Sequence, residues 1–372
     1  MALFLCSLVL FAFSAAAQQV DAVEAILKQA IALHQAGNAE AAVPLYEKYL
    51  AQRPNSVLAL SNLGAAYSKL GRYRDAAGLY RRALKLQPGN AAVELNLALA
   101  FYKSGQFSEA IASLEKVHRA APNEMQPILL LADCWLRTGE NKKVVELLAP
   151  IADVRADDLA IAYLLGTALV RDEQFTRGQP IIDRILRHGE SAEARLLLGT
   201  TKLNAGDYPA ALIDLAKAVE LNPGLPDAYS YYGQALLRTG DPLAATAAYR
   251  KAIASNPNDF AANLEFAILL KDEDKIAEAK ECLARALAVR PDHLPARYQL
   301  AAIALREGQL DVARRELEAI VKAAPAYTEA HVTLATVYYR LKRKEDGDRE
   351  RAIVQKLNAE AQQKQQQGVN VK

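Results

Sequence analysis

The chain lacks an excess of charge of either sign: its 372 residues carry a formal net charge of +2. Nucleic-acid-binding and membrane-surface proteins usually display a basic patch, so this balance gives no reason to expect either partner. Aromatic residues are scarce at 7%. The apolar half of the chain is mostly Ala and Leu, a helix-rich composition. Because a single compact core rarely grows to this length, we expect several domains or a repeat array.

Signatures of catalysis and metal binding are also missing. The five histidines are widely dispersed: His34, His118, His188, His293 and His331. None stands in a His-x-x-x-His or Glu-His spacing that would suit a metal. The sequence contains no Gly-rich phosphate loop, nucleophile elbow or catalytic Cys signature. We therefore predict that the protein is not an enzyme and has no metal or small-molecule cofactor.

Long hydrophobic runs are limited to one, at the N-terminus. Residues 2–17 form an apolar run that ends in Ser14-Ala15-Ala16-Ala17, directly before Gln18. Small residues after such a run predict a secretory signal cleaved after Ala17, although no Lys or Arg precedes the run. The run is shorter than the roughly 18–20 residues of a spanning helix, which disfavours a permanent anchor. We expect a periplasmic or secreted protein, with an uncleaved N-terminal anchor as the alternative.

The rest of the chain repeats with a period of 34 residues. Prolines show this period in two series: Pro54, Pro88 and Pro122, then Pro223, Pro257, Pro291 and Pro325. A ladder of small residues shows it through ten repeats: Ala30, Gly64, Ala98, Ala132, Gly166, Gly199, Gly233, Ala267, Ala301 and Ala335. Only the step from Gly166 to Gly199 is 33 residues, which indicates a single deletion in an otherwise regular array.

With the small residue numbered as position 8, other positions also keep one residue type. Position 7 is Leu, Tyr or Phe in nine repeats, and position 15 is Gly and position 20 is Ala in seven each. Small residues at positions 8 and 20 let two helices approach, and large apolar residues at positions 4, 7, 11 and 24 fill the seam. Gly at position 15 ends the first helix in a left-handed cap, and Pro at position 32 ends the second.

This pattern resembles the tetratricopeptide repeat. The stretch from Leu60 to Tyr67 carries the resemblance, followed by Gly71, Tyr73, Ala76, Tyr80, Ala83 and Pro88. The resemblance, to tetratricopeptide-repeat proteins of exported bacterial type, covers roughly residues 23–357 and implies an all-α, right-handed α-solenoid of about ten helix pairs. We predict a signal peptide over residues 1–17 and a solenoid over 18–360 with a capping helix at 343–360. Residues 361–372 are predicted to be a disordered Gln-rich tail.

Departures from the repeat cluster in residues 140–192. Glu173 replaces Gly at position 15, Pro150 and Pro180 fall within second helices, and the deletion follows. Such changes alter the local superhelical twist, so we expect this segment to be a joint.

Cys134 and Cys282 lie four repeats apart. Helix layers add about 8–10 Å each, whereas a disulfide requires Cα atoms within roughly 7 Å. The two are expected to be buried thiols, and Trp135 at position 11 is expected in the core.

In the family, the first helices line a concave groove that binds partner segments, through positions 2, 5, 6, 9, 12 and 13. One known mode clamps acidic chaperone tails with Lys and Asn at set positions, and no repeat here has that pair. Asn62 and Asn96, both at position 6, resemble the start of the asparagine ladder of the O-GlcNAc transferase superhelix, whose amides bind peptide backbone. The partner is therefore predicted to be a protein or peptide segment.

The groove positions carry an acidic bias, with Lys28 as the one basic residue at positions 2, 5, 6 and 9. Four acidic residues occupy position 2: Glu24, Glu193, Asp227 and Glu329. Since the helix dipole favours an anion in the first turn, a helix-start role competes there with ligand recognition. Asp133 and Glu265, past the first turn, are the better groove candidates. Tyrosines also map to the groove, where they either stack on a partner or pack internally: Tyr102, Tyr163, Tyr231, Tyr298 and Tyr339.

Position 13 is basic in seven repeats: Lys69, Lys103, Arg137, Arg171, Arg238, Arg306 and Arg340. These residues form either a basic rim for a partner or a structural set, because a cation in the last turn complements exposed carbonyls. The structural interpretation is favoured.

Two functions remain. One is a non-enzymatic scaffold that holds a segment of an envelope protein in its groove. The alternative is an adaptor subunit of an envelope export or assembly machine of the polysaccharide or pilus type.

Overall fold

The computed structural model describes residues 21–187, 189 and 191–369, all of them in helices or the turns between helices. The predicted signal peptide and its cleavage site lie outside the described residues. The chain divides into two compact units, Met1–Gln174 and Phe175–Lys372. Their boundary falls within residues 140–192, where the sequence departs most from its repeat. No helix among the described residues is both long and apolar enough to cross a membrane.

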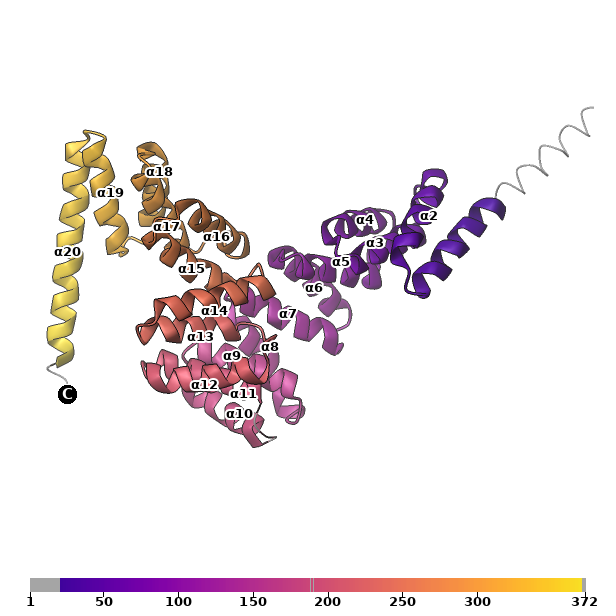
Figure 1. Ribbon diagram of the computed structural model, residues 1–372, viewed down its shortest axis with the longest axis horizontal. Coiled ribbons are helices and arrows are strands. Elements are labelled where there is room, and N and C mark those ends of the chain that lie inside the picture. The colour runs from indigo at the N-terminus through magenta and orange to yellow at the C-terminus, as the bar shows by residue number, and fades with distance from the viewer. Residues whose placement is uncertain (1–20, 188, 190, 370–372) are drawn as a thin grey trace, which may run out of the picture. The chain divides into compact units, whose positions relative to one another are not determined.

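Each repeat is a pair of helices, which Figure 1 shows in the order of the chain within each unit. The first helix of the first repeat covers residues 21–35. The later first helices are α3 (Val57–Lys69), α5 (Ala91–Lys103), α7 (Met125–Thr138), α9 (Leu159–Arg171), α11 (Ala192–Asn204), α13 (Ala228–Arg238), α15 (Phe260–Asp272), α17 (Leu294–Arg306) and α19 (Thr328–Arg340).

Each second helix follows the first helix of its repeat in the chain. The second helices are α2 (Ala39–Gln52), α4 (Tyr73–Leu86), α6 (Phe107–Ala120), α8 (Asn141–Val154), α10 (Phe175–Arg187), α12 (Tyr208–Leu221), α14 (Pro242–Ser255), α16 (Ile276–Val289), α18 (Leu310–Ala323) and α20 (Lys344–Val369). Pairs such as α3 with α4, α5 with α6 and α11 with α12 pack against each other. The prolines at position 32 follow these helices by two residues, for example Pro88 after α4. The all-α repeat architecture predicted from the sequence is confirmed.

The small residues at positions 8 and 20 lie where paired helices touch. The alanines at position 20, such as Ala42 and Ala245, have no exposed surface. A Cβ atom added to Gly64 would lie 2.7 Å from the ring of Tyr80, and one added to Gly233 would lie 2.7 Å from the ring of Tyr249. The close approach predicted at position 8 is therefore confirmed.

Position 15 is left-handed in all ten repeats. The seven glycines there have φ between 75° and 91°. The three exceptions to glycine keep the same conformation, with φ of 58° at Glu173, 65° at Asp274 and 62° at Lys342. A left-handed backbone is strained for a residue with a side chain. The first helix nevertheless ends in this conformation at all three non-glycine positions.

The prediction that large apolar residues fill the seam is wrong at position 4. Five repeats hold a polar side chain there, each bonded to position 23 or 26 of the second helix of its own repeat. The pairs are Glu94–Lys116, Arg195–Asp214, Asn263–Arg285, Arg297–Glu316 and His331–Glu350. A polar group that leaves water needs a partner, and the second helix supplies it.

The missing residue and the C-terminal helix are the two irregular features. The described part of helix α10 has 13 residues, where α2, α4, α6 and α8 have 14. Helix α20 runs to Val369, past residue 360 and through most of the segment assigned to a disordered tail. Gln, Lys and Ala are good helix formers, and no proline interrupts them.

Cys134 and Cys282 are both free and buried, as predicted. Burial, followed by the charge of Asp133, raises the pKa of the Cys134 thiol to about 12. Since the thiolate is the reactive form, this cysteine is inert at neutral pH. Trp135 is 8% exposed and belongs to the core, as expected from position 11.

Candidate functional site

The predicted binding residues all lie on first helices, and each is partly exposed. We call this surface the first-helix face. In the first unit it carries Asn62 on α3, Asn96 and Tyr102 on α5, Asp133 on α7 and Tyr163 on α9. In the second unit it carries Tyr231 on α13, Glu265 on α15 and Tyr298 on α17. The two sets are described separately, one for each unit.

Asn62 and Asn96 occupy the same register of α3 and α5, which contact each other. Within the described part of the chain, neither side-chain amide hydrogen-bonds another protein group. Each amide offers two donors and one acceptor oxygen, which can pair with peptide backbone. These two side-chain amides are therefore available to a ligand on the first-helix face.

Tyr102 and Asp133 are brought together across α5 and α7. The Tyr102 hydroxyl donates to Asp133 Oδ2 at 2.5 Å, and Arg137 Nε donates to the same oxygen at 2.8 Å. Burial, then the negative charge of Asp133, raises the pKa of the Tyr102 phenol. The Arg137 guanidinium also lies 5.7 Å from the Tyr102 ring centre and 5.5 Å from that of Phe107. Asp133 thus has a structural task, tying together two neighbouring first helices.

Glu265 is half-buried on α15. Burial raises the pKa of its carboxyl group, and the positive charge of Arg238 opposes that rise. Arg238 is exposed at the end of α13, the preceding first helix. A carboxylate here costs desolvation energy in the free protein, so a cationic partner that approached Glu265 would relieve it.

The remaining tyrosines are engaged inside the protein. The Tyr298 hydroxyl and Thr333 Oγ1 are 3.0 Å apart, and the Tyr298 ring lies 5.5 Å from the Tyr327 ring between centres. Tyr163 and Tyr231 also have interactions within the protein. The sequence left open whether Tyr298 packs internally or stacks on a partner, and the structure shows internal packing.

Position-13 cations reach back to the preceding repeat. Arg171 donates to the Leu136 carbonyl at 3.1 Å, Arg306 to the Lys271 carbonyl at 3.1 Å, and Arg340 to the Leu305 carbonyl at 3.3 Å. Each accepting carbonyl lies in the last turn of the previous first helix, where carbonyls lack helical partners. The structural interpretation of position 13 therefore holds in these three repeats. The carbonyls that each arginine caps belong to the preceding first helix and not to its own helix.

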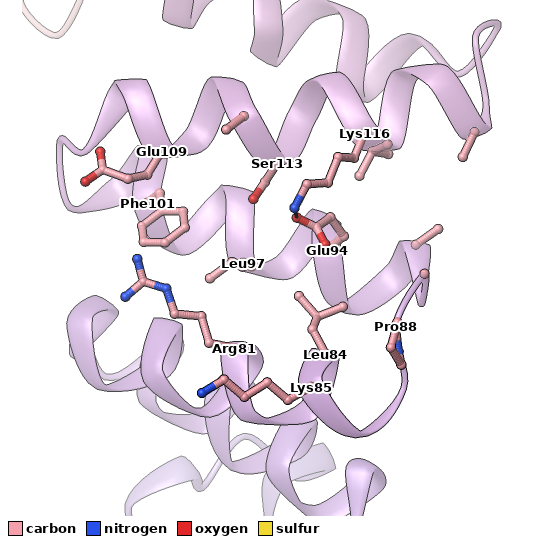
Figure 2. A pocket seen from close by; sticks show the side chains of 15 residues that line it. Arg81, Leu84, Lys85, Pro88, Glu94, Leu97, Phe101, Glu109, Ser113 and Lys116 are labelled. Carbon is pink, nitrogen blue, oxygen red and sulfur yellow. Dashed lines mark hydrogen bonds and ion pairs between the residues drawn. The ribbon is translucent and has the colours of Figure 1, made fainter.

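The structure also contains a groove that the sequence did not reveal, between α4 and α6 over α5 (Figure 2). It has a volume of about 610 Å³. The signal that could have revealed it is Glu94, a charged residue at a packing position, opposite the basic pair Arg81 and Lys85 one helical turn apart. No cluster of His, Cys, Asp and Glu that could hold a metal occurs among the described residues.

Comparison with protein families agrees with this geometry. Two tetratricopeptide-repeat models match, one over residues 101–168, 236–303 and 270–326 and the other over 163–226 and 196–260. The chain is a tetratricopeptide-repeat protein. Proteins of this architecture are interaction scaffolds. Residues 11–114 match a further model, described as surface lipoprotein assembly modifier, N-terminal TPR repeats.

A solved structure shows the same fold at low sequence identity, and a second matches with a lower TM-score. The APC/C hetero-tetramer Cut9–Hcn1 is 13% identical, with 88% of this tetratricopeptide-repeat chain and 79% of that chain covered and a TM-score of 0.56. IFIT1, as a monomeric mutant with Gppp-AAAA, is 14% identical, with 90% of each chain covered and a TM-score of 0.47. No curated protein is significantly similar in sequence.

Proposed function

We propose that this protein is a non-enzymatic scaffold outside the cytoplasm, and that it binds an extended segment of a partner protein on its first-helix face. The observation that carries the proposal is the pair Asn62 and Asn96. Both amides are partly exposed, lie in one register on adjacent helices, and lack hydrogen-bond partners among the described residues. Side-chain amides that recur at one register can pair with groups that recur along a ligand. A peptide backbone supplies such groups, because every residue carries a carbonyl and nearly every residue an N–H.

The chemistry of the face favours a neutral or basic segment. Asp133 is already paired with Arg137, so the negative charge that remains is that of Glu265. Arg171, Arg306 and Arg340 are used in capping neighbouring helices. An acidic segment would be repelled by the Glu265 carboxylate, so electrostatic complementarity opposes it.

Export is part of the proposal and rests on the apolar run at residues 2–17. The intact mass of protein extracted from its native cells tests it directly. A mature chain that begins at Gln18 supports export as a processed protein. Retention of residues 1–17 in all of the material would contradict this and favour an N-terminal anchor.

Photo-crosslinking tests the binding face. A photoreactive residue at Asn62 or Asn96 in the protein expressed in its native cells should form a covalent adduct with one partner. The control is the same residue at Glu281, which is exposed on the second helix α16. A partner captured equally well from Glu281, or no capture from either asparagine, would contradict the proposal.

A second candidate function is an adaptor in an envelope assembly or export machine. It is favoured by the match of residues 11–114 to the N-terminal repeats of a surface lipoprotein assembly modifier. The two functions differ in what co-purifies. An adaptor should isolate with a membrane complex and show no affinity for an isolated peptide, whereas the scaffold should bind the crosslinked segment alone.

A further inference from the structure

The groove between α4 and α6 has one apolar floor and two walls. Leu97 and Phe101 of α5 lie at its base, and Leu84 of α4 and Val117 of α6 flank them. Small residues widen it, among them Ala112 on α6. Its volume of about 610 Å³ is within the range of about 300–1,000 Å³ usual for ligand sites. Figure 2 shows Leu84 of the α4 wall and Ser113 and Lys116 of the α6 wall directed toward the space between the walls.

The lining of this groove carries one more basic than acidic residue. Arg81 and Lys85 lie on the α4 wall and Lys116 on the α6 wall, against the two carboxylates of Glu94 and Glu109 (Figure 2). Glu94 is already paired, because Lys116 Nζ donates to its Oε1 at 3.1 Å. Neither Arg81 nor Lys85 forms an ion pair within the described residues, although the Arg81 guanidinium lies 4.9 Å from the centre of the Phe101 ring.

On the wall formed by α4, both charged residues that line the groove are basic, Arg81 and Lys85. Such a surface attracts anions and raises their local concentration. The first-helix face of the first unit instead offers the amides of Asn62 and Asn96, so the two surfaces are suited to different partners.

The shape of the groove selects among anions. It opens to solvent along its length, and the α6 wall from Glu109 to Ala120 extends about 16 Å at 1.5 Å per residue. That length accommodates about five extended residues or three helical turns. An acyl chain would instead favour an enclosed tunnel that removes most of its surface from water.

We propose that this groove is a second binding site, which takes an acidic peptide segment of a partner protein with apolar side chains between its carboxylates. The carboxylates pair with Arg81 and Lys85, and the apolar side chains cover Leu84, Leu97 and Val117. This site lies apart from the first-helix face, so its test is independent of the function proposed above.

A random-peptide display library, selected on the full chain, tests the proposal. Clones are then compared on the wild type, on Arg81→Glu with Lys85→Glu, and on Ala112→Trp, which fills the groove from an exposed position. The matched control, Arg82→Glu with Arg119→Glu, makes the same charge change at exposed neighbours outside the groove. Thermal melting followed by circular dichroism shows whether each variant folds.

We expect acidic, Leu- or Phe-containing peptides that lose affinity by about tenfold or more in both groove variants, because a like charge replaces an attractive one. The control should keep wild-type affinity. The proposal is overturned if no selected peptide loses binding in the folded groove variants, or if the selected peptides lack acidic residues. Tighter binding of dodecanoate than of any selected peptide would also overturn it, in favour of a lipid ligand.

Discussion

Arg306 of α17 donates from Nη1 to the carbonyl oxygen of Lys271 in α15, and from Nη2 to Asp274 at 2.7 Å. One arginine thus caps the end of the preceding first helix and bonds the left-handed residue that terminates it. Arg171 and Arg340 make the equivalent carbonyl contact in their own repeats. These three basic residues of position 13 therefore couple their repeats to the preceding ones.

Replacing Arg306 with alanine should lower the free energy of unfolding by about 0.5–1 kcal/mol, because both partners of this cap are largely exposed. Urea denaturation measures it. Arg306→Lys should lose most of the same stability, since an ammonium group cannot make both bonds in this fork geometry. Equal stability of wild type and Arg306→Ala would show that the cap contributes nothing.

The close approach at position 8 gives a second prediction. Gly233→Ala should destabilise the protein by about 1–3 kcal/mol, since the new Cβ collides with the Tyr249 ring. Gly78→Ala in α4 is the matched control, because nothing lies within 4 Å of its added Cβ. That change should instead stabilise by about 0.5–1 kcal/mol through helix propensity. The same sign for both substitutions in thermal melts would refute the assigned packing.

Lys342 offers a stabilising change. Its φ of 62° is the left-handed value that glycine adopts at position 15 elsewhere. Lys342→Gly should raise stability by about 1 kcal/mol, because the side chain no longer strains the backbone. Gly308→Ala, at the same position with φ 76°, should lower it by a similar amount. Denaturation midpoints that move the other way would contradict this account.

Glu265 predicts a pH dependence. Burial raises the pKa of its carboxyl group in the folded state, so that state holds the proton more tightly than the unfolded chain. Its contribution is fully favourable below the ordinary carboxyl value of 4.5 and is lost as pH rises through the raised pKa. Glu265→Gln should therefore gain stability relative to wild type as pH rises, by at most about 1.4 kcal/mol per pH unit within that window.

Urea denaturation at acidic and neutral pH compares the two proteins. Glu281→Gln, an exposed change on α16, should leave the pH dependence of stability unaltered. An advantage of Glu265→Gln that stays constant from acidic to neutral pH would show that the carboxyl group is not destabilised by burial.

Backbone geometry was predictable from the sequence wherever one residue type serves one steric need. The glycines of position 15, the alanines of position 20 and the prolines of position 32 set the helix ends and contacts from the sequence alone. Glu173, Asp274 and Lys342 adopt the same left-handed conformation as the glycines of position 15. The turn at this position therefore does not depend on glycine alone.

The polar contacts were less predictable, because they depend on which side chain of another helix happens to face a given position. Asp133 was expected to face a partner, yet it is held by Tyr102 and Arg137. The groove of Arg81 and Lys85 depends on the separation of α4 and α6, which belong to different repeats. No local pattern encodes that separation.

The central claim is that the first-helix face, and not the row of position-13 cations, binds the partner. The affinity of a partner identified by crosslinking should be measured for Asn62→Ala with Asn96→Ala and for Arg238→Ala with Arg306→Ala. We predict that the first pair weakens binding by roughly tenfold, or about 1.4 kcal/mol, without lowering the melting temperature, and that the second pair leaves the affinity unchanged. Loss of affinity in the arginine variant, with wild-type affinity in the other, would contradict the account and make the basic rim the binding surface.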